Sequence, residues 1–362
     1  MRPVLLAAIT LSSALVWGAA PAAPPAPAAS PVSSLSLPPP KAGHPRALVV
    51  VLADNAGAET TDYVIPYGVL KESGVADVLG VATHPGPVKL MLSMTVDADE
   101  TTSQFEAQHP EGADLVIVPY IVDAKNPAVI AFLKSQYGKG ATVMSICAGA
   151  YSLAEAGLLD GKQATSHWSR LKNLTHRYRQ VRWVRDRRYV QDGRVISTAG
   201  VTASIPASLA LVEAMGGRPT AEAEAVRLGV GDWSARHRTA DFTVTRGDFA
   251  QGLSNLLAFW SHERVETPVR EGFDEMALAL RSDAWGNTLK TKVVITGTNG
   301  PVRSRHGLVL NPDAPPRPGA YVMPEHAGGG ATQLNLALSD MAQRYGAGTA
   351  RLAALGLEYP RP

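Results

Sequence analysis

The sequence contains one cysteine, Cys147, within the stretch SICAGA at residues 145–150. This cysteine stands between an apolar, β-branched run typical of a strand and a run typical of a helix. Small neighbours are what a sharp strand-to-helix turn requires, because a nucleophile placed there leaves no room for larger side chains. Backbone N–H groups of the following helix would also point at the thiol, where they lower its pKa and can bind an oxyanion. The stretch therefore favours a cysteine nucleophile, and the alternative is a small buried core residue.

Two polar residues are candidate partners for this thiol. Glu59 follows the first predicted strand, and His167 follows a short strand-like segment after the predicted elbow helix. In an α/β sheet, residues just past the carboxyl ends of the strands meet in one crevice. We therefore expect Glu59, Cys147 and His167 to converge. The alternatives are a solvated loop acid for Glu59 and an ordinary half-buried histidine, beside Trp168, for His167.

The sequence predicts neither a metal nor a cofactor. No pair of histidines or acidic residues has a metal-ligand spacing, and a single cysteine excludes zinc clusters built on thiolates. The GKG at residues 138–140 is not a phosphate loop, because no Lys-Ser or Lys-Thr follows at a helix start. The basic run RYRQVRWVRDRR alternates its charges and indicates a solvated strand face.

Composition indicates a globular protein of more than one domain. The chain has 362 residues, of which 45% are hydrophobic, and a formal net charge of +2. This apolar fraction is enough to build a core, and the length exceeds that of one typical domain. Because the charge balance creates no broad basic field, a small-molecule substrate or ligand is expected and a nucleic-acid partner is not.

Residues 1–20 have the layout of a secretory signal peptide, with Arg2, an apolar run to Trp17 and small residues up to Ala20. An uncleaved N-terminal membrane anchor is the alternative, although the run is short for a span of about 20 residues. Residues 21–45 are rich in Pro, Ala and Ser and predict an extended, unpacked linker. We expect an exported protein, periplasmic or secreted, with no stable membrane span once the signal is cleaved.

Strands and helices alternate from residue 46 to residue 218. RALVVVL, ADVLGVAT, ADLVIVPY and ATVMSI are runs typical of buried strands, and the segments between them have helical character. A strand pair with a turn at Asp192-Gly193 and a closing helix complete the region. This order predicts a three-layer, flavodoxin-like α/β sandwich with a mainly parallel sheet.

The remainder of the chain indicates a connector and a partial repeat. Residues 219–265 carry apolar residues at helical spacing and predict a helical connector. Residues 266–362 match the opening half of the first domain: GPVRSRHGLVLNPD corresponds to GPVKLMLSMTVDAD, and GFDEMALALRSDAW corresponds to GAETTDYVIPYGVL. We interpret this as a degenerate, truncated half-copy of the same α/β fold. In this match Leu355 takes the position of Cys147, so the second copy lacks the thiol.

Four segments carry a resemblance to a known family: GAETTDYVIPYGVLKESG, ADLVIVP, SICAGAYSLAEAGLLDGKQATSHW and VISTAGVTASIPASLALVEAMGG. Together they resemble the ThiJ/PfpI superfamily, which has the class I glutamine amidotransferase-like fold. ATSHW and TAGVTASIPASLALV look most like isonitrile hydratase-like proteins and the amidase-like domain of AraC-type regulators. The resemblance covers residues 46–230, and AraC-type relatives continue into a helix-turn-helix module that we do not find after residue 219.

The resemblance implies a role for each residue of the candidate site. It implies a nucleophile at Cys147, with an acid at Glu59 hydrogen-bonded to the sulfur and a histidine at His167 nearby. In isonitrile hydratases the thiolate would attack the isocyanide carbon, and water would complete an N-formamide. Other relatives act as glyoxalases, deglycases, chaperones or peptidases.

The resemblance also implies oxyanion donors and substrate contacts. The backbone N–H groups of Ala148 and Tyr120 would hold the oxyanion, although many relatives have a glycine pair where this chain has Tyr120. Trp168, Gly200 and Val201 would contact the substrate.

Three functions follow from these observations. The first is an exported cysteine-dependent hydratase or hydrolase, acting through a covalent thio-intermediate. The second is a non-catalytic protein that binds a small ligand or reports oxidation through Cys147. Such a protein would derive from the amidase-like domain of an AraC-type regulator and would itself lack the DNA-binding module. The third is an interaction module in which the half-copy acts as a built-in partner, as an intramolecular pseudo-dimer, or in which two chains form a homodimer.

Overall fold

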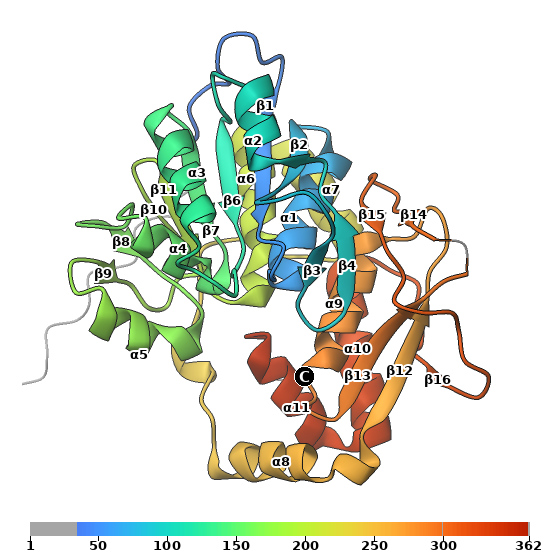
Figure 1. The fold of residues 1–362 in the computed structure, drawn as a ribbon. Coiled ribbons are helices and arrows are strands. Elements are labelled where there is room, and N and C mark those ends of the chain that lie inside the picture. Colours follow the sequence, from blue (N-terminus) through green and yellow to red (C-terminus); the bar gives the residue numbers. More distant parts are fainter. Residues whose placement is uncertain (1–34, 299, 361–362) are drawn as a thin grey trace, which may run out of the picture. The chain divides into compact units, whose positions relative to one another are not determined.

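A central sheet of seven strands organises the part of the chain that the computed structural model describes, residues 35–298 and 300–360 (Figure 1). The spatial order is β10 (Tyr189–Asp192), β11 (Val195–Thr198), β7 (Thr142–Ser145), β6 (Leu115–Val118), β1 (Ala47–Ala53), β2 (Ala76–Ala82) and β5 (Glu100–Thr101). Neighbouring strands pair in parallel except β10, which pairs antiparallel with β11. The predicted α/β fold with a mainly parallel sheet is confirmed.

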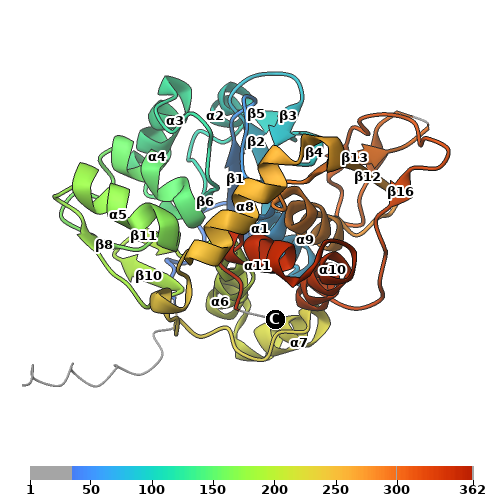
Figure 2. The same cartoon turned by 90° about the horizontal axis from the view of Figure 1, so that it is seen from below.

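Helices cover both faces of this sheet because alternate side chains of each strand point to opposite sides. Along β1, Val49 and Val51 belong to one core, which includes residues of α1 (Thr60–Ser73) and α6 (Ser204–Gly216). Val50 belongs to a second core, which includes residues of α2 (Thr102–Gln108), α3 (Pro127–Gly138) and α4 (Ala150–Glu155). Figure 2 shows the resulting three layers from below.

Local signals in the sequence explain where several elements begin and end. Helix α1 ends at Gly74, which takes the left-handed conformation at φ 67° that glycine adopts without a steric penalty. Helix α3 begins at Pro127, where the missing N–H has no helical partner to lose. The expected turn at Asp192-Gly193 joins β10 to β11.

The residues before β1 differ from their prediction. The segment up to residue 45 was expected to be an unpacked linker, but Leu35 is buried at 5% exposure. His44 also lies 2.7 Å from Asp114 through its Nδ1. Residues 35–45 are therefore attached to the domain by an apolar side chain and a polar anchor, although most of the segment is exposed. The predicted signal peptide at 1–20 lies outside the described residues.

The C-terminal region contains a second, smaller sheet. Strands β12 (Glu263–Pro268) and β13 (Thr291–Thr296) pair in parallel, and helix α9 (Glu275–Gly286) lies between them in the chain. Strand β16 (Tyr321–Val322) pairs in parallel with the other edge of β12. In the order β13-β12-β16, the first strand in sequence lies between the other two, as β1 lies between β2 and β6 in the large sheet.

The two regions share a sheet and a helix contact. The hairpin β3 (Val88–Leu90) and β4 (Met94–Asp97) joins the hairpin β14 (Val302–Arg303) and β15 (Val309–Leu310), with β4 antiparallel to β15. Helix α1 packs against α9. The described residues consequently belong to one compact unit.

Four further helices complete the description. Helices α7 (Arg218–Leu228) and α8 (Arg246–Leu257) lie in the predicted connector, and α10 (Gly330–Tyr345) and α11 (Ala347–Gly356) follow β16.

Leu355 lies within α11, whereas Cys147 follows a strand, so the expected correspondence of these two positions is wrong. Among the described residues, we find no helix that is long and apolar enough to cross a membrane.

Candidate functional site

The candidate site lies at the carboxyl edge of four adjacent strands, β11, β7, β6 and β1. The residue or loop that follows each strand contributes to it: Gly200 after β11, Cys147 after β7, Tyr120 after β6 and Glu59 after β1. Parallel strands end at the same edge, so residues distant in sequence meet there. The predicted convergence of Glu59 and Cys147 on one edge is a consequence of this strand order.

Cys147 has the backbone geometry of a nucleophile elbow. Its φ is 54°, in the left-handed region that residues with a side chain rarely adopt. A short 3₁₀ turn, Cys147–Gly149, joins it to α4. The Cys147 N–H donates to the Ala199 carbonyl at 3.1 Å, and the Ser166 hydroxyl donates to the Cys147 carbonyl at 2.7 Å. These contacts hold the elbow between β11 and the loop before His167.

The small residues around the elbow are required by close packing. A Cβ added at Gly149 would overlap the Val118 carbonyl and approach the Pro119 oxygen to 2.8 Å. The elbow thus lies directly against the end of β6. The sequence argument that the turn leaves no room for larger neighbours agrees with this geometry.

The thiol itself is buried and electrostatically disfavoured as a thiolate. Cys147 is 6% exposed. Burial raises its pKa well above the ordinary value, and the nearby carboxyl groups of Asp62, Glu59 and Glu358 raise it further. The N–H of Ala148 lowers the pKa through a hydrogen bond, as the elbow predicts, but this effect is the smaller one. The expected net lowering of the thiol pKa is therefore wrong for this conformation.

Glu59 caps helix α1 rather than bonding to the sulfur. Its carboxylate accepts a hydrogen bond from the Asp62 N–H at 2.6 Å and one from the Thr61 hydroxyl at 3.0 Å. No hydrogen bond between Glu59 and Cys147 occurs among the described residues, so the Glu59 carboxylate influences the thiol through space.

Glu59 also belongs to a buried acid cluster with Asp62 and Asp283. Asp283 comes from α9 in the C-terminal region, and its carboxylate accepts from the Thr61 hydroxyl at 3.3 Å. Burial and the charge of Glu59 raise the pKa of both Asp62 and Asp283 well above the ordinary value. Burial therefore favours the protonated form of these two carboxyl groups. Among the described residues, no group of three or more His, Cys, Asp or Glu side chains has a geometry that could hold a metal ion.

The backbone of Tyr120 is already engaged. Its N–H donates to the Asp62 carboxylate at 3.1 Å, and its carbonyl accepts from the Glu59 N–H at 2.8 Å. Tyr120 therefore is not a free oxyanion donor in this structure. Of the two predicted oxyanion donors, the Ala148 N–H is the one that lowers the pKa of the Cys147 thiol.

His167 stands next to the elbow with both ring nitrogens engaged. Nδ1 lies 2.8 Å from the Ser169 hydroxyl and accepts from the Ser169 N–H, which makes His167 the N-cap of α5 (Trp168–Arg177). Nε2 lies 3.2 Å from the Gly356 carbonyl, which accepts its proton. Burial lowers the pKa of His167, so the imidazole is neutral at neutral pH.

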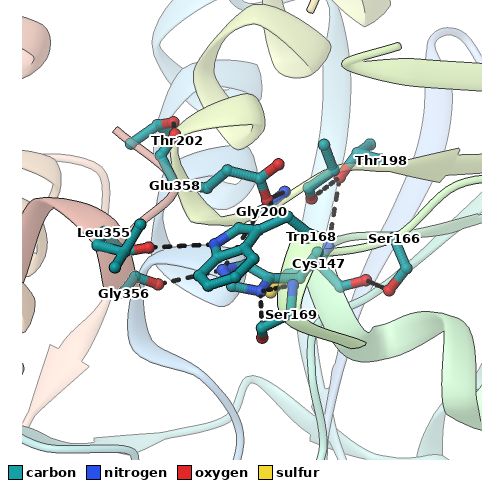
Figure 3. Close-up of polar contacts among 12 residues, drawn as sticks. Cys147, Ser166, Trp168, Ser169, Thr198, Gly200, Thr202, Leu355, Gly356 and Glu358 are labelled. Carbon is teal, nitrogen blue, oxygen red and sulfur yellow. Dashed lines mark hydrogen bonds and ion pairs between the residues drawn. The ribbon is translucent and has the colours of Figure 1, made fainter. Parts of the chain in front are cut away.

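The end of α11 and the residues after it, 355–359, cover this group of residues (Figure 3). The Trp168 indole N–H donates to the Leu355 carbonyl at 3.2 Å. The Glu358 carboxylate accepts from the Gly200 N–H at 2.6 Å, from the Trp168 N–H at 3.2 Å and from His237 Nε2 at 2.7 Å. Two of the three predicted substrate-contacting residues, Trp168 and Gly200, thus contact the C-terminal segment.

A cavity of about 310 Å³ adjoins this segment. Gly200, Thr202, His237 and Glu358 line it together with apolar side chains of α6 and α10. Val201 is not among its lining residues and is buried in the core at 5% exposure. The predicted substrate contact at Val201 is thus a core position in this structure.

Four charged residues of the site were not predicted from the sequence. Asp62 lies three residues beyond Glu59, and a buried acid in the first turn of a predicted helix is a signal that could have identified it. Asp283 and Glu358 lie 53 and 128 residues beyond the resembling segment, which ends at residue 230, and His237 lies in a loop seven residues beyond it. They reach the site only because the C-terminal region packs on the first domain.

This fold and site define a class: α/β proteins with a cysteine elbow at the carboxyl edge of a mainly parallel sheet. Residues 46–214 match the DJ-1/PfpI family. This part of the chain is a DJ-1/PfpI family domain, and the resemblance found in its sequence is confirmed.

Relatives of this chain differ in their activities. It is 29% identical to the Parkinson disease protein 7 homolog of Danio rerio over 186 residues, which cover 49% of this chain and 92% of that protein. It is 36% identical to isonitrile hydratase of Pseudomonas putida over 97 residues, 27% of this chain and 41% of the hydratase. It is 34% identical to the HTH-type transcriptional regulator CdhR of Pseudomonas aeruginosa over 129 residues, 35% of this chain and 37% of the regulator.

Among solved structures, Drosophila melanogaster DJ-1beta matches with a TM-score of 0.47 and 24% identity, over 52% of this chain and all of that one. The proteins to which this chain is similar include both an enzyme and a transcriptional regulator.

Proposed function

We propose that this protein is a cysteine-dependent hydratase or hydrolase that acts on a small electrophilic compound, with isonitriles as the first class to test. The observation that carries the proposal is the left-handed backbone of Cys147, directly after strand β7 and at the start of the 3₁₀ turn Cys147–Gly149. Such strain persists only where the surrounding structure holds it, and it collects at functional positions. Similarity to an isonitrile hydratase supports the choice of substrate class.

The proposed reaction balances with water as the second reactant. The Cys147 sulfur forms a bond to the terminal carbon of the isonitrile R–NC, and the thiol proton passes to that same carbon. The product of this step is the thioimidate Cys–S–CH=N–R. Water then adds to the same carbon, the S–C bond breaks, and the N-formamide R–NH–CHO leaves as the thiol regains its proton. Neither step requires an oxidant or a reductant.

A substrate panel tests this proposal. Isonitriles, glyoxals and small amides are offered to the wild-type protein and to Cys147→Ser, with circular dichroism as a control for folding. We expect turnover of at least one class by the wild type and a loss of roughly a thousandfold or more in Cys147→Ser. Equal rates for the two proteins, or no turnover of any class by the wild type, would remove the catalytic proposal.

A second candidate function is ligand binding or redox sensing without turnover. It is supported by the resting geometry, in which the thiol is buried and both ring nitrogens of His167 are engaged. Under this function, two equivalents of hydrogen peroxide would oxidise Cys147 through the sulfenic acid to the sulfinic acid, with one water formed in each step. The product is visible as a mass increase of two oxygens, and the unfolding temperature would change. If the protein turns over an isonitrile and its thiol resists oxidation, the result would favour the catalytic function over redox sensing.

We infer that the C-terminal region, residues 266–362, is a degenerate half-copy that takes the place of a second subunit. Support comes from the matching order of β2-β1-β6 and β13-β12-β16 and from the pairing of β4 with β15. The full chain is then expected to sediment as a monomer, and a chain ending near Arg264 is expected to dimerise or aggregate. A stable dimer of full-length chains would contradict this inference.

We also infer export through residues 1–20, because their layout is that of a secretory signal. The expected result is a mature protein beginning at Pro21, which the intact mass of the exported form measures. A mass that includes Met1, in the membrane fraction, would favour the anchor instead.

A further inference from the structure

Three hydrogen-bond donors from different elements converge on one carboxylate beside Cys147. The donors are the Gly200 N–H after β11, the Trp168 N–H at the start of α5 and His237 in the loop after α7. We propose that these three groups form a carboxylate-binding site, and that Glu358 occupies it as an internal ligand. A small carboxylic acid takes the same place when the segment at residues 355–359 withdraws.

The site is built closely around the carboxylate it holds. Glu358 is 2% exposed, so its charge depends on protein donors rather than on water. Its backbone φ is 55°, in the left-handed region that a residue with a side chain rarely adopts. A Cβ at Gly200 would overlap the Glu358 carboxylate and the His167 ring. A strained backbone on one side and a glycine on the other therefore bring the carboxylate against the Gly200 N–H.

The covering segment, residues 355–359, is held at the site by hydrogen bonds to groups that a ligand could also use. The carbonyl of Gly356 accepts from His167 Nε2, and the carbonyl of Leu357 accepts from the Thr202 N–H at 3.1 Å. The Thr202 hydroxyl donates to the Glu358 carbonyl at 2.7 Å. The segment thus engages side chains and backbone groups at the mouth of the cysteine site. Its withdrawal would free these donors and expose the thiol.

The adjoining cavity sets the size and character of the ligand. The cavity of about 310 Å³ has Gly200, His237 and Glu358 in its wall, so a molecule held by its carboxylate can extend into it. The remaining wall is mostly apolar, through side chains such as Ile205, Phe242 and Leu334, and it also includes the charged side chains of Arg188 and Asp232. These features select a monocarboxylate with a small aliphatic or aromatic body. That this ligand is the substrate of Cys147 rests on the proposed function, whereas its binding does not.

Chemical rescue of the missing carboxylate tests the site. Glu358→Gly removes the carboxylate and relieves the left-handed backbone, and Glu358→Ala serves for the same comparison if the glycine variant does not fold. Each variant is titrated with sodium acetate, with acetamide as the neutral isostere and sodium chloride at equal ionic strength. The readouts are the unfolding temperature and the rate at which iodoacetamide labels Cys147, the single cysteine of the chain. Glu222→Gln, at an exposed acid paired with Arg218, is the matched control.

In the Glu358 variants we expect labelling to accelerate about tenfold. Acetate should then slow the labelling and raise the unfolding temperature, saturating with concentration, while acetamide and chloride do neither. Adding His237→Ala should weaken the acetate effect about tenfold, and the wild type and Glu222→Gln should not respond to acetate.

If acetate acts no differently from acetamide in the Glu358 variants, the carboxylate site is refuted, whatever the substrate panel shows. Conversely, acetate rescue without turnover of any substrate would leave this site intact and remove only the proposed catalysis.

Discussion

The Thr61 hydroxyl in α1 donates to the Asp283 carboxylate in α9 at 3.3 Å, across 222 residues of sequence. This contact brings an acid from the C-terminal region against Glu59, two residues before Thr61. The cysteine site is therefore not confined to the family domain. The charges around its thiol depend on both regions of the chain.

The first prediction concerns the buried acid cluster. Because the pKa of Asp283 is raised in the folded protein, the folded state binds more protons than the unfolded state above pH 3.9. The stability that this proton contributes is complete below pH 3.9 and is lost as the pH rises through the folded pKa. Asp283→Asn removes this pH-dependent loss of stability, because asparagine stays neutral at every pH. We expect the variant to gain about 1 kcal/mol or more in unfolding free energy at pH 8 and nothing at pH 4.

Urea unfolding at pH 4, 6 and 8 measures this difference. Asp241→Asn, at an acid that is 53% exposed, is the control and should show the wild-type pH dependence. A variant that loses stability at pH 8 would mean that Asp283 is ionised in the folded protein.

The second prediction concerns the reactivity of the thiol. Since burial and nearby carboxylates raise the pKa of Cys147, iodoacetamide labelling of the wild type should rise only at a pH above the ordinary thiol pKa of about 8.5. Glu59→Gln keeps an acceptor for the Asp62 N–H and removes one negative charge, so its labelling curve should shift to lower pH. Labelling rates from pH 6 to pH 10 measure both curves, and a wild-type midpoint below pH 8 would contradict this account.

The third prediction uses the close approach at Gly200. Its backbone has φ −69°, which alanine adopts freely, so Gly200→Ala tests space alone. The added Cβ would displace Glu358 and His167, and we expect a loss of about 1–3 kcal/mol in stability and faster labelling of Cys147. Gly138→Ala, where an added Cβ meets nothing within 4 Å, is the control. Unchanged labelling in Gly200→Ala would show that the segment does not protect the thiol.

Sequence patterns were sufficient for the elements of the first domain. The strands β1, β6 and β7 are short apolar runs, and α1 and α3 carry a terminal glycine or an initial proline, so local chemistry specifies them. The position of Cys147 at a turn flanked by small residues was predictable for the same reason. The pairing of parallel strands then explains why Glu59 and Cys147 share an edge.

Local patterns were not sufficient for the polar environment of the thiol. The engagement of the Tyr120 N–H by Asp62 depends on how α1 approaches the end of β6, which no periodicity in the sequence describes. Likewise Leu355, matched to Cys147 by sequence, lies in a helix, because a weak repeat does not determine which secondary structure its last segment adopts.

By itself, the sequence determined the α/β class, the order of its elements and the elbow cysteine, because these depend on residues close together in the chain. Only the tertiary structure decided which charges surround that cysteine. Asp283 and Glu358 lie more than 130 residues beyond it and reach it through the packing of α9 and the segment after α11. Burial and electrostatics at the thiol are properties of that packing, and so the protonation of Cys147 is set by the assembled fold.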